Sequence, residues 1–532
     1  MSNSSSTLRA DVLIVGAGPV GLTLANLLGT YGVRTVIIER HDATVHEPRA
    51  VSIDDESLRT MQAAGLVDDV VKDVVMGYGV RYFSWRGNPF AAIQPTRQEY
   101  GYPKRNAFRQ PLLEATLAQG TRRFGHVSLL FRHELLSFEQ SATGVTAQVR
   151  HDGGELTIEA PWMVACDGGR SPVREMLGIP LEGETYPERW LIVDLAQRTV
   201  PLRHTSTFCD PRRPAIRLPG PHGTLRYEFM LRPGDRDEEV LDEKNFRAWI
   251  ANREPQDTEL PLVRKVIYTF HARVAQRWRE GRVFLAGDAA HLTPPFAGQG
   301  LNSGIRDATN LSWKLAAVVR GQAPESILDT YESERRPHAS ALIRMALRIG
   351  HFMQPKSVFG AAVSQAALRV ACLLPPVRDY ILQLKFKPKP VLERGWYQPS
   401  PVAPKAELLT QPRVELPDGR HVLMDTVLGG DYAVLGWDSP AFRAAAARLL
   451  PPGAPGRVVG VLRQELDFIG TLPQDMALVR DVTGELAQWL DARGAVAVVI
   501  RPDRYWYALV APQALGASQA QSLPLPVQAR AA

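Results

Sequence analysis

Three short motifs, far apart in the chain, carry the residue types that can hold a dinucleotide. They are the glycine-rich turn GAGPVG at residues 16–21, an Asp-Gly pair at 167–168, and a Gly-Asp pair at 287–288 that is followed by GQG at 298–300. Glycine lets a backbone approach a phosphate closely, and a carboxylate can accept hydrogen bonds from sugar hydroxyls. One such turn is a weak signal, but the three motifs in this order predict sites for the pyrophosphate, the sugars and the reactive ring of one long dinucleotide.

The first motif lies in a predicted β-α-β unit. Residues 11–15 form a short, nearly all-apolar run, which is typical of a strand buried in a parallel sheet. Residues 19–31 have the apolar spacing of a helix, and residues 34–39 are predicted as a second strand. The helix start, with Pro19 and Val20, would face the phosphates and offer them about half a positive charge.

Each glycine of this turn has its own predicted role. Gly16 permits the tight turn, Gly18 lets the backbone approach the pyrophosphate, and Gly21 lets helix and strand pack closely. Glu39 ends the second strand, where its carboxylate can accept hydrogen bonds from the adenosine ribose, and Arg40 follows it. The alternative for Glu39 is a surface glutamate at a strand end. A carboxylate here would repel a 2′-phosphate, so the turn favours FAD or NAD over NADP.

The later motifs favour FAD over NAD. Two more apolar strands are predicted at residues 162–166 and 282–286, and they run into Asp167 and into Gly287-Asp288. An aspartate at the carboxyl end of a parallel strand can bind a chain of hydroxyls, and FAD has a ribitol where NAD has none. The next turn leads into a helix whose start can aim amides at the flavin pyrimidine edge. Its predicted cofactor contacts are Pro295, Gly298, Gly300, Leu301 and Asn302.

With these motifs the chain resembles the class A flavoprotein monooxygenases, the single-component aromatic hydroxylases. The strings GDAAHLTPPFAGQGLNSGIRDATNLSWKL and VACDGGRSPVRE match two motifs of that family, and the resemblance extends from about residue 10 to residue 400. It implies that Arg49 meets the pyrophosphate and that Gln110 lies near the ribityl chain. The other implied FAD contacts are Gly16, Gly18, Gly21, Glu39 and Asp288, and Gly287 beside Asp288 is also predicted as a contact. It also implies an α/β fold class, with a Rossmann-like FAD-binding domain, an inserted β-sheet substrate domain and a C-terminal thioredoxin-like domain that lacks cysteines.

Segments outside the FAD motifs resemble one group within that family, the 3-(3-hydroxyphenyl)propionate and 3-hydroxycinnamate hydroxylases. Among these segments are PRAVSIDDESLRTMQAAGLVDDV, RNAFRQP and LPPVRDYILQLKFKPKP. The resemblance implies an FAD-dependent monooxygenase of aromatic compound degradation, with a small phenol and O2 as substrates and NADH, or NADPH, as a transient electron donor. The implied reaction is ortho-hydroxylation of the phenol to a catechol through a flavin C4a-hydroperoxide.

Three other functions stay open at this point. They are hydroxylation of another phenolic or polyketide substrate by a class A enzyme, a flavoprotein without oxygenase activity, and a flavin-linked dehydrogenase. Intact motifs at all three cofactor positions favour the hydroxylases. The sequence has no second GxGxxG motif and no CxxxxC motif, which argues against a separate NAD(P)H domain and against a disulfide reductase.

No motif identifies the residue that activates the phenol, and the candidates for a direct role are Arg226, Tyr227 and His291. Along residues 225–230 alternate side chains face opposite ways, so Arg226 and Glu228 would share one face. Arg226 would bind a substrate carboxylate or steady the flavin, and a surface ion pair with Glu228 is the alternative. His291 has an acid-base side chain, but a structural role within the flavin turn is favoured.

The order of elements predicts that a substrate-binding sheet interrupts the FAD-binding domain and that a proline-rich linker leads to a further domain. The predicted boundaries are residues 1–174 and 281–395 for the two parts of the FAD-binding domain, 175–280 for the substrate-binding sheet domain, 396–405 for the linker, 406–513 for the thioredoxin-like domain and 514–532 for a disordered tail. Because the thioredoxin-like segment contains no cysteine, we expect packing or homodimer contact there and no redox activity.

The composition narrows the class of protein further. The chain has 532 residues and a formal net charge of +6, with no Lys/Arg block long enough for a nucleic-acid or membrane patch and no apolar run long enough to span a bilayer. Its three cysteines, Cys166, Cys209 and Cys372, match no disulfide framework and no metal cluster. We therefore expect no metal, no nucleic-acid or membrane partner, and a reducing cytoplasm.

Overall fold

The computed structural model describes residues 7–47, 49–200, 202–400, 402–464 and 476–516. Its central layer is a six-stranded sheet in the order β19-β20-β13-β2-β3-β9, parallel throughout except for β19. The strands are β19 Arg279–Glu280, β20 Val283–Leu285, β13 Trp162–Ala165, β2 Val12–Val15, β3 Thr35–Glu39 and β9 Val127–Phe131. Strands β2 and β13 are apolar along their whole length because both faces of the sheet are covered.

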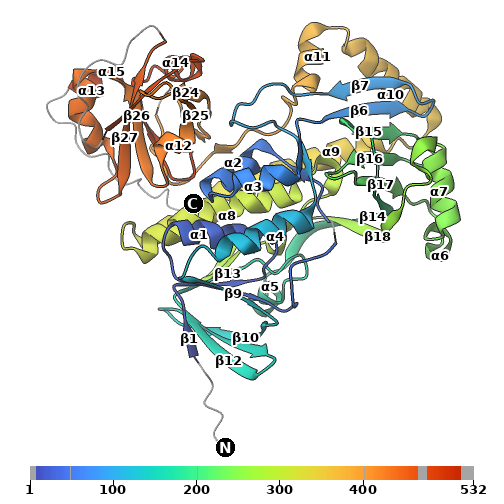
Figure 1. Cartoon of the computed structure of the whole chain (residues 1–532), viewed down its shortest axis with the longest axis horizontal. Helices are drawn as coiled ribbons and strands as arrows, with labels where there is room; N and C mark the ends of the chain where they lie inside the picture. The colour runs from blue at the N-terminus through green and yellow to red at the C-terminus, as the bar shows by residue number, and fades with distance from the viewer. Residues whose placement is uncertain (1–6, 48, 201, 401, 465–475, 517–532) are drawn as a thin grey trace, which may run out of the picture.

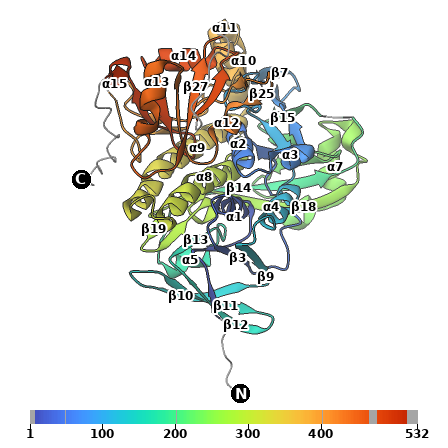
Figure 2. The ribbon, with the colours of Figure 1, turned by 60° about the vertical axis from the view of Figure 1, so that its left-hand side comes forward.

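Helices cover one face of the central sheet, and a small sheet covers the other (Figure 1). The main covering helices are α1 Pro19–Thr30, α4 Gln110–Thr121 and α8 Gly300–Val319. The small sheet has the order β1-β12-β11-β10. Its strands are β1 Thr7–Arg9, β12 Gly154–Ala160, β11 Val145–His151 and β10 Glu134–Gln140. The turned view of Figure 2 shows the same stacking, with short helix α5 (Pro172–Met176) after β13.

An eight-stranded sheet stands beside the central layer, in the order β21-β18-β14-β17-β16-β15-β6-β7. Its strands are β21 His291–Leu292, β18 Leu262–Ala275, β14 Leu181–Leu195, β17 Leu225–Met230, β16 Ala215–Pro219, β15 His204–Cys209, β6 Gly79–Ser84 and β7 Pro89–Ile93. Strands β6 and β7 come from the segment predicted as the first part of the FAD-binding domain. The predicted boundary at residue 174 therefore separates strands that hydrogen-bond to one another, because β6 pairs with β15.

Both faces of the eight-stranded sheet are packed with apolar side chains. Helices α6 (Asp237–Val240) and α7 (Glu243–Ala251) lie on one face, where Phe246 and Ile250 are buried. The end of α9 Thr330–Met353 and the helices α10 Val358–Ala371 and α11 Pro375–Leu382 lie on the other. A three-stranded sheet with α2 Asp55–Ala63 and α3 Val67–Val70 connects the two large layers, and its strands are β4 Ser52–Ile53, β8 Asn106–Phe108 and β5 Val74–Met76.

The C-terminal unit is a seven-stranded mixed sheet with short helices. Its order is β25-β24-β28-β27-β26-β29-β30, and β26, β27 and β28 are parallel. The strands are β25 His421–Leu423, β24 Arg413–Glu415, β28 Met476–Arg480, β27 Gly456–Leu462, β26 Tyr432–Trp437, β29 Ala497–Ile500 and β30 Trp506–Val510. The helices are α12 Met424–Leu428, α13 Pro440–Ala445, α14 Glu485–Asp491 and α15 Pro512–Gly516. A two-stranded pair, β22 Val391–Leu392 with β23 Ala406–Glu407, brackets the predicted linker.

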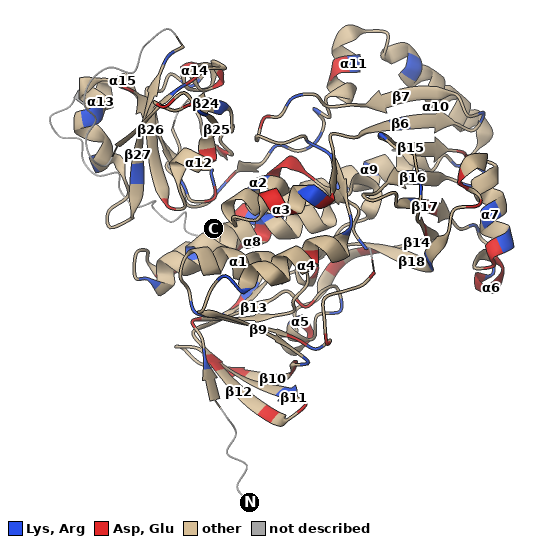
Figure 3. Cartoon of the chain, in the orientation of Figure 1, with Lys and Arg blue, Asp and Glu red and all other residues tan. Residues whose placement is uncertain are grey.

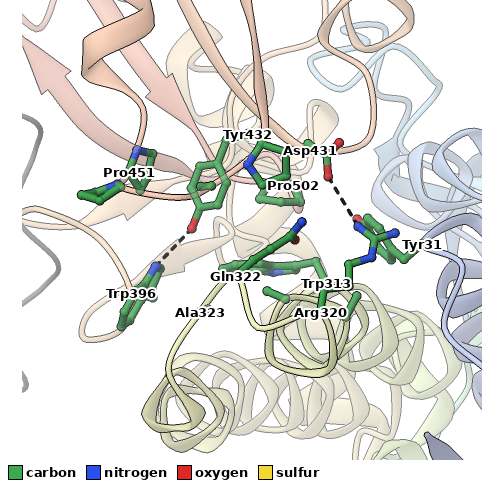
Figure 4. Close-up of a pocket in the computed structure, with 15 residues that line it drawn as sticks. Tyr31, Trp313, Arg320, Gln322, Ala323, Trp396, Asp431, Tyr432, Pro451 and Pro502 are labelled. Carbon is green, nitrogen blue, oxygen red and sulfur yellow. Dashed lines mark hydrogen bonds and ion pairs between the residues drawn. The ribbon is translucent and has the colours of Figure 1, made fainter.

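The C-terminal unit packs against α1 and α8 around a small hollow of about 40 Å³ (Figure 4). The indole Nε1 of Trp396 donates a hydrogen bond to the Tyr432 hydroxyl at 3.1 Å, and Arg320 lies 4.0 Å from Asp431. Trp313 of α8 meets the Tyr432 ring edge-on at 5.9 Å. One buried apolar cluster therefore continues from the central sheet into the C-terminal unit.

Charged residues of both signs are spread through all layers (Figure 3). Within the described part of the chain, no single helix is long and apolar enough to cross a membrane. Helices α10 and α11 pass that test by length and composition only as a pair, and the pair is bent by 110° at the break between them.

Candidate functional site

One large cavity of about 520 Å³ lies between the carboxyl ends of the central parallel strands and the eight-stranded sheet. Open α/β sheets bind their ligands at this edge. The predicted cofactor contacts on its wall are Gly16, Gly18, Pro19, Val20, Glu39, Arg40, Arg49, Gln110, Asp167, Asp288, Pro295, Gly298, Gly300 and Leu301. Gly21, Gly287 and Asn302, which were also predicted as contacts, do not line it.

The first glycine turn is shaped by backbone contacts. Gly16 has a φ of +103°, and a Cβ there would lie 2.5 Å from the carbonyl oxygen of Cys166, so only glycine fits. A Cβ on Gly18 would meet nothing within 4 Å, because this stretch of backbone faces the open cavity. Helix α1 then begins at Pro19 without a side-chain cap, which leaves its first N–H groups available to an anion.

The carboxylate of Glu39 is held at the end of β3. One of its oxygens accepts a hydrogen bond from the Ala17 N–H at 3.0 Å, and the other accepts from the His41 N–H at 3.1 Å. A carboxylate has further lone pairs, so both oxygens can still accept hydrogen bonds from the hydroxyls of a bound sugar.

Gln110 connects the cavity wall to the loop above it. Its Oε1 accepts a hydrogen bond from the Ala50 N–H at 2.8 Å, and its Nε2 donates to Glu114 at 2.7 Å. Glu114 also accepts a hydrogen bond from the Val45 N–H at 3.0 Å. Glu114 lines the cavity and was missed from the sequence, where nothing distinguishes it from other helix glutamates.

Two aspartates supply carboxylates where the sheet opens into the cavity. Oδ2 of Asp167 accepts a hydrogen bond from the Val173 N–H at 3.1 Å, whereas the buried Oδ1 has no hydrogen-bond partner among the described residues. The Asp288 carboxylate is accessible from the cavity and surrounded by protein. Burial raises the pKa of its carboxyl, although His291 and Arg49 lower it. These features fit a ligand with both phosphates and sugar hydroxyls, such as FAD. They are the unpartnered oxygen of Asp167, the Asp288 carboxylate that is open to the cavity, and the open space at Gly18.

Asp288→Ala is expected to weaken FAD binding by about 10- to 100-fold, because a charged hydrogen bond contributes about 1.5–3 kcal/mol. Fluorescence titration of the FAD-free protein with FAD measures this change. Asp152→Ala, an exposed aspartate on the β11–β12 hairpin, is the matched control. An Asp288→Ala protein that purifies with full flavin occupancy and unchanged affinity would refute the assignment.

Asn302 holds the third glycine turn (residues 298–300) in place by hydrogen bonds and does not itself line the cavity. Its Nδ2 donates to the carbonyl oxygens of Ser52 and Gly298 at 3.1 and 2.6 Å, and its Oδ1 accepts from the Asp54 N–H at 3.0 Å. Gly298 has a φ of +61°, and α8 begins two residues later at Gly300. Asn302 therefore positions the turn, whereas it was predicted to contact the cofactor.

A buried layer of charges supports this turn and the start of α2. Arg306 of α8 is hydrogen-bonded to Asp54 and Glu56, and the Lys387 ammonium lies 3.0 Å from each of the same two carboxylates. Asp54, Asp55 and Glu56 bring carboxylate oxygens within 4.8 Å of one another, the spacing of a metal site. Arg306 and Lys387 balance the charges of Asp54 and Glu56, and burial raises the pKa of Asp55 to about 7, so the cluster works as a structural ion network.

His291 does not line the cavity. It is fully buried, its Nε2 lies 2.7 Å from Asp307, and its ring packs against Trp278 at 5.1 Å. Asp307 also accepts hydrogen bonds from the Gly287 N–H and from Arg335. The structure therefore places His291 in the support of the motif, in agreement with the structural role that the sequence favours.

Arg226 and Tyr227 are also absent from the cavity wall. Arg226 is buried, donates to both oxygens of Asp194 at 2.7 and 3.1 Å, and donates to the Arg49 carbonyl at 2.8 Å. The predicted pair with Glu228 is present at 3.9 Å, but it is buried and not at the surface. The predicted roles of Arg226 in binding a substrate carboxylate or steadying the flavin stay predictions. Tyr227 points to the opposite face of the sheet and donates to Asp257 at 2.8 Å.

The far half of the cavity is built from side chains for which the sequence predicted no contact with the substrate. They come from alternate positions on neighbouring strands of the eight-stranded sheet and from the segments that face it. They are Tyr78, Val80, Tyr82, Arg105, Thr205, Thr207, Ile216, Leu218, Glu228, Tyr268, Phe270, Thr293, Phe296 and Met353. This half is mainly apolar and aromatic, with a few polar groups, which suits a small aromatic ligand.

Glu228 is the acid of this half. It is buried, its Oε1 lies 3.9 Å from Nη1 of Arg226, and the carboxylate of Asp194 lies beyond that guanidinium. Burial raises the pKa of Glu228 to about 7, since the nearby Asp194 adds to the effect and Arg226 only partly offsets it. Glu228 can therefore exchange a proton near neutral pH.

Two family models match the chain. Residues 9–346 match a model described as an FAD binding domain, and residues 406–523 match one described as the HcaD C-terminal domain. The first match covers more than half of the chain and contains all of the glycine and aspartate motifs that line the cavity.

Two curated relatives are similar over nearly the whole chain. The 3-(3-hydroxy-phenyl)propionate/3-hydroxycinnamic acid hydroxylase of Klebsiella pneumoniae (strain 342) is 40% identical over 524 residues, which cover 96% of this chain and 93% of the relative. A protein of the same name from Mycobacterium sp. (strain JLS) is 42% identical over 502 residues, which cover 93% of this chain and 88% of the relative. Among solved structures, the flavin-dependent monooxygenase PieE in complex with FAD and substrate superimposes with a TM-score of 0.79. The match covers 94% of this chain and 96% of PieE at 24% sequence identity, so it shows a similar fold.

Proposed function

The chain belongs to the FAD binding domain family and is an FAD-dependent aromatic monooxygenase, and from this premise we propose that it hydroxylates a 3-hydroxyphenyl alkanoate or alkenoate ortho to its hydroxyl. The names of its relatives suggest 3-(3-hydroxyphenyl)propionate and 3-hydroxycinnamate as the compounds to test. The product would be a catechol. NADH is the proposed electron donor.

One observation carries the proposal: the FAD-binding turns and the apolar chamber open into the same cavity. Gly18, Asp167 and Asp288 would hold FAD by its pyrophosphate and sugars at one end, and Glu228 faces the other end. When bound, FAD would take up electrons from a nicotinamide and use them to activate O2. The chain contributes a mainly apolar chamber and side chains that would orient the phenol.

We propose that Glu228 accepts the proton of the phenol. An aromatic ring is most reactive toward an electrophile as its phenolate, and a phenol of ordinary pKa near 10 is neutral at pH 7. The charged groups that face Glu228 are Arg226 on its own strand and Asp194 on β14, and the Tyr268 hydroxyl of β18 lies on the same wall. The carboxylate form of Glu228 is the form that can accept the proton.

The hydroxylation rate is therefore expected to rise with pH through about 7 and to level off above it, since Glu228 is neutral below its pKa. Glu228→Gln should remove this rise and lower kcat by about 100-fold, the scale of general base catalysis. Steady-state rates between pH 5.5 and pH 8.5 would measure both effects. Glu184→Gln, on the exposed part of β14, is the control, and an unchanged pH profile in Glu228→Gln would contradict the role.

The experiment that tests the proposed function measures NADH consumption by the FAD-loaded protein with and without 3-(3-hydroxyphenyl)propionate, and identifies the product by mass. Strong stimulation with gain of one oxygen atom supports the proposal. Stimulation that yields hydrogen peroxide and no oxygenated product would indicate an aromatic hydroxylase with a different substrate. The absence of stimulation would reject this substrate class.

The finer domain assignments are part of the same proposal. We propose that residues 175–280, together with β6 and β7, provide the substrate side, and that the thioredoxin-like unit at 406–513 serves packing or dimer contact. A cytoplasmic location, a homodimer, and the absence of nucleic-acid and membrane partners stay predictions. The tail at 514–532 lies outside the described residues from residue 517 onward.

A further inference from the structure

We infer that Arg105 is the residue that binds the carboxylate at the end of the substrate side chain. This inference rests on the proposed function, because it concerns the same chamber and the same class of ligand. It replaces Arg226, which was the sequence-based candidate and which Asp194 already neutralises.

Arg105 differs from the other arginines on the cavity wall, Arg40 and Arg49. Arg40 lies beside Glu39 at the end of the first β-α-β unit, and its Nε bonds to the His41 ring at 3.3 Å. Arg49 acts electrostatically on Glu114 and on Asp288, both next to the predicted cofactor contacts. Among the described residues, no carboxylate lies within 4.0 Å of the Arg105 guanidinium.

The guanidinium of Arg105 is held in a fixed orientation by a neutral partner. It stacks over the ring of Tyr78 at 5.0 Å from the centroid, and its Nη2 donates to the Tyr78 hydroxyl at 3.1 Å. The same hydroxyl lies 3.3 Å from Oγ of Ser52. Nε of Arg105 is buried and has no hydrogen-bond acceptor among the described residues.

An unpaired buried donor on a charged group is unfavourable, and the planar guanidinium fork matches a carboxylate. A ligand carboxylate in the chamber would supply both the missing acceptor and the missing negative charge. Phosphate offers the same chemistry, but the phosphates of FAD are expected at Gly18, at the other end of the cavity.

Arg105 and Glu228 line the same chamber from different segments of the chain. Across the sheet, Tyr82 pairs with Thr207, Thr207 with Ile216, and Ile216 with Glu228, which makes three strand spacings or about 14 Å. Arg105 packs on Tyr78, which directly precedes β6, and it acts electrostatically on Tyr82 at the far end of this row. A ligand with a phenol at one end and a carboxylate at the other can therefore meet Glu228 and Arg105 together, with its ring on the wall between them. In the reverse orientation, the ligand carboxylate would lie beside the carboxylate of Glu228.

The test compares ligands that differ only in the carboxylate. Dissociation constants of 3-(3-hydroxyphenyl)propionate, its neutral amide and 3-ethylphenol are measured from the flavin absorbance change of the full FAD-loaded protein, without NADH. The variants are Arg105→Met, Arg105→Lys and, as a control, Arg81→Met, an exposed arginine on β6. We expect Arg105→Met to weaken binding of the acid by about 10- to 100-fold and to change the dissociation constants of the two neutral ligands by less than about threefold. Arg105→Lys should recover part of the loss.

Three results would overturn the inference. They are equal weakening of all three ligands in Arg105→Met, loss of FAD from that variant, and a wild-type protein that binds the acid no better than its amide. The last comparison needs no variant, so it holds even if Arg105→Met does not fold. The two proposals fail separately. Hydroxylation of 3-ethylphenol without preference for the acid would reject only Arg105, and carboxylate-dependent binding without hydroxylation would reject only the proposed reaction.

Discussion

Replacing Glu334 by alanine is expected to lower the free energy of unfolding by about 3–5 kcal/mol, the usual effect of leaving buried charges without their partner. Glu334 of α9 accepts two hydrogen bonds from Arg501 at 2.9 and 2.7 Å and one from Lys314 at 2.8 Å. It also accepts from the Trp396 N–H at 2.7 Å and from Asn310 at 2.6 Å. All of these groups lie in the interface between α8, α9 and the C-terminal unit.

The pKa values agree with this role. Burial raises the pKa of Glu334, but Arg501 and Lys314 outweigh burial and hold it well below its ordinary range. Burial lowers the pKa of Lys314 to about 8 even with Glu334 present, so loss of the glutamate would favour the neutral amine. The cation of Arg501, however, stays charged and would lose its main partner on α9.

Thermal unfolding of the FAD-saturated protein and limited proteolysis around residues 396–405 would measure the effect of Glu334→Ala. Glu393→Ala removes an exposed glutamate that pairs with Lys405 at 2.8 Å, and it should cost at most about 1 kcal/mol. An equal, small shift of the unfolding midpoint in both variants would contradict the role of Glu334. Faster cleavage at 396–405 in Glu334→Ala alone would support it.

The second large effect is expected from two neighbouring glycines that behave differently. A Cβ on Gly21 would lie 2.0 Å from the Gly16 carbonyl oxygen, so Gly21→Ala must force β2 and α1 apart. We expect it to lower the free energy of unfolding by about 3 kcal/mol or more. A methyl group at position 18 meets open space, so Gly18→Ala should fold normally. The methyl group would, however, lie where the pyrophosphate is expected, so we expect the variant to bind FAD at least about tenfold more weakly.

Chemical denaturation of the FAD-free forms and FAD titration separate these two outcomes. If Gly21→Ala is as stable as the wild type, the contact between helix and turn has been misjudged. If Gly18→Ala binds FAD as the wild type does, the pyrophosphate does not pass over this glycine. Gly125→Ala serves as a control, because a Cβ there also meets nothing within 4 Å and the residue lies away from the cavity.

The cofactor half of the site could be predicted from the sequence because its geometry is local. Gly16, Gly18 and Glu39 belong to one β-α-β unit, in which short-range turn chemistry decides which groups face a ligand. Sequence spacing cannot separate residues that line the cavity from residues that support its turns. Asn302 and Gly21 belong to the motifs but do not line the cavity, and Gly21 packs against the turn as its predicted packing role requires.

The substrate half could not be predicted because its residues meet only through sheet pairing. Thr207, Ile216 and Glu228 lie on three strands, and Tyr82 comes from a segment before residue 100 that joins the same sheet. The partner of Arg226 is Asp194, on another strand, so the sequence did not reveal that this guanidinium is already neutralised. Arg105 begins the segment RNAFRQP, but that segment gave no role to the arginine, and only its place beside Tyr78 shows that its charge lacks an acidic partner in the described chain.

The elements were better predicted than the way they join. The strands at 11–15, 34–39 and 162–166 were expected within one residue of β2, β3 and β13. Helices α10 and α11 and the strands of the small sheet were not expected, since their short or continuous apolar runs fit more than one element type. The buried ions at Glu334 and Arg501 were not foreseen either, because 167 positions separate the two residues.

The central claim is that this chain inserts one atom of O2 into the ring of a 3-hydroxyphenyl alkanoate. The most direct test is turnover of 3-(3-hydroxyphenyl)propionate with NADH under ¹⁸O2, followed by mass spectrometry of the product. We predict a catechol that carries one ¹⁸O atom in its new hydroxyl, and no label when ¹⁸O is supplied as water. A product whose new oxygen comes from water, or an oxidised product with no added oxygen, would contradict the claim.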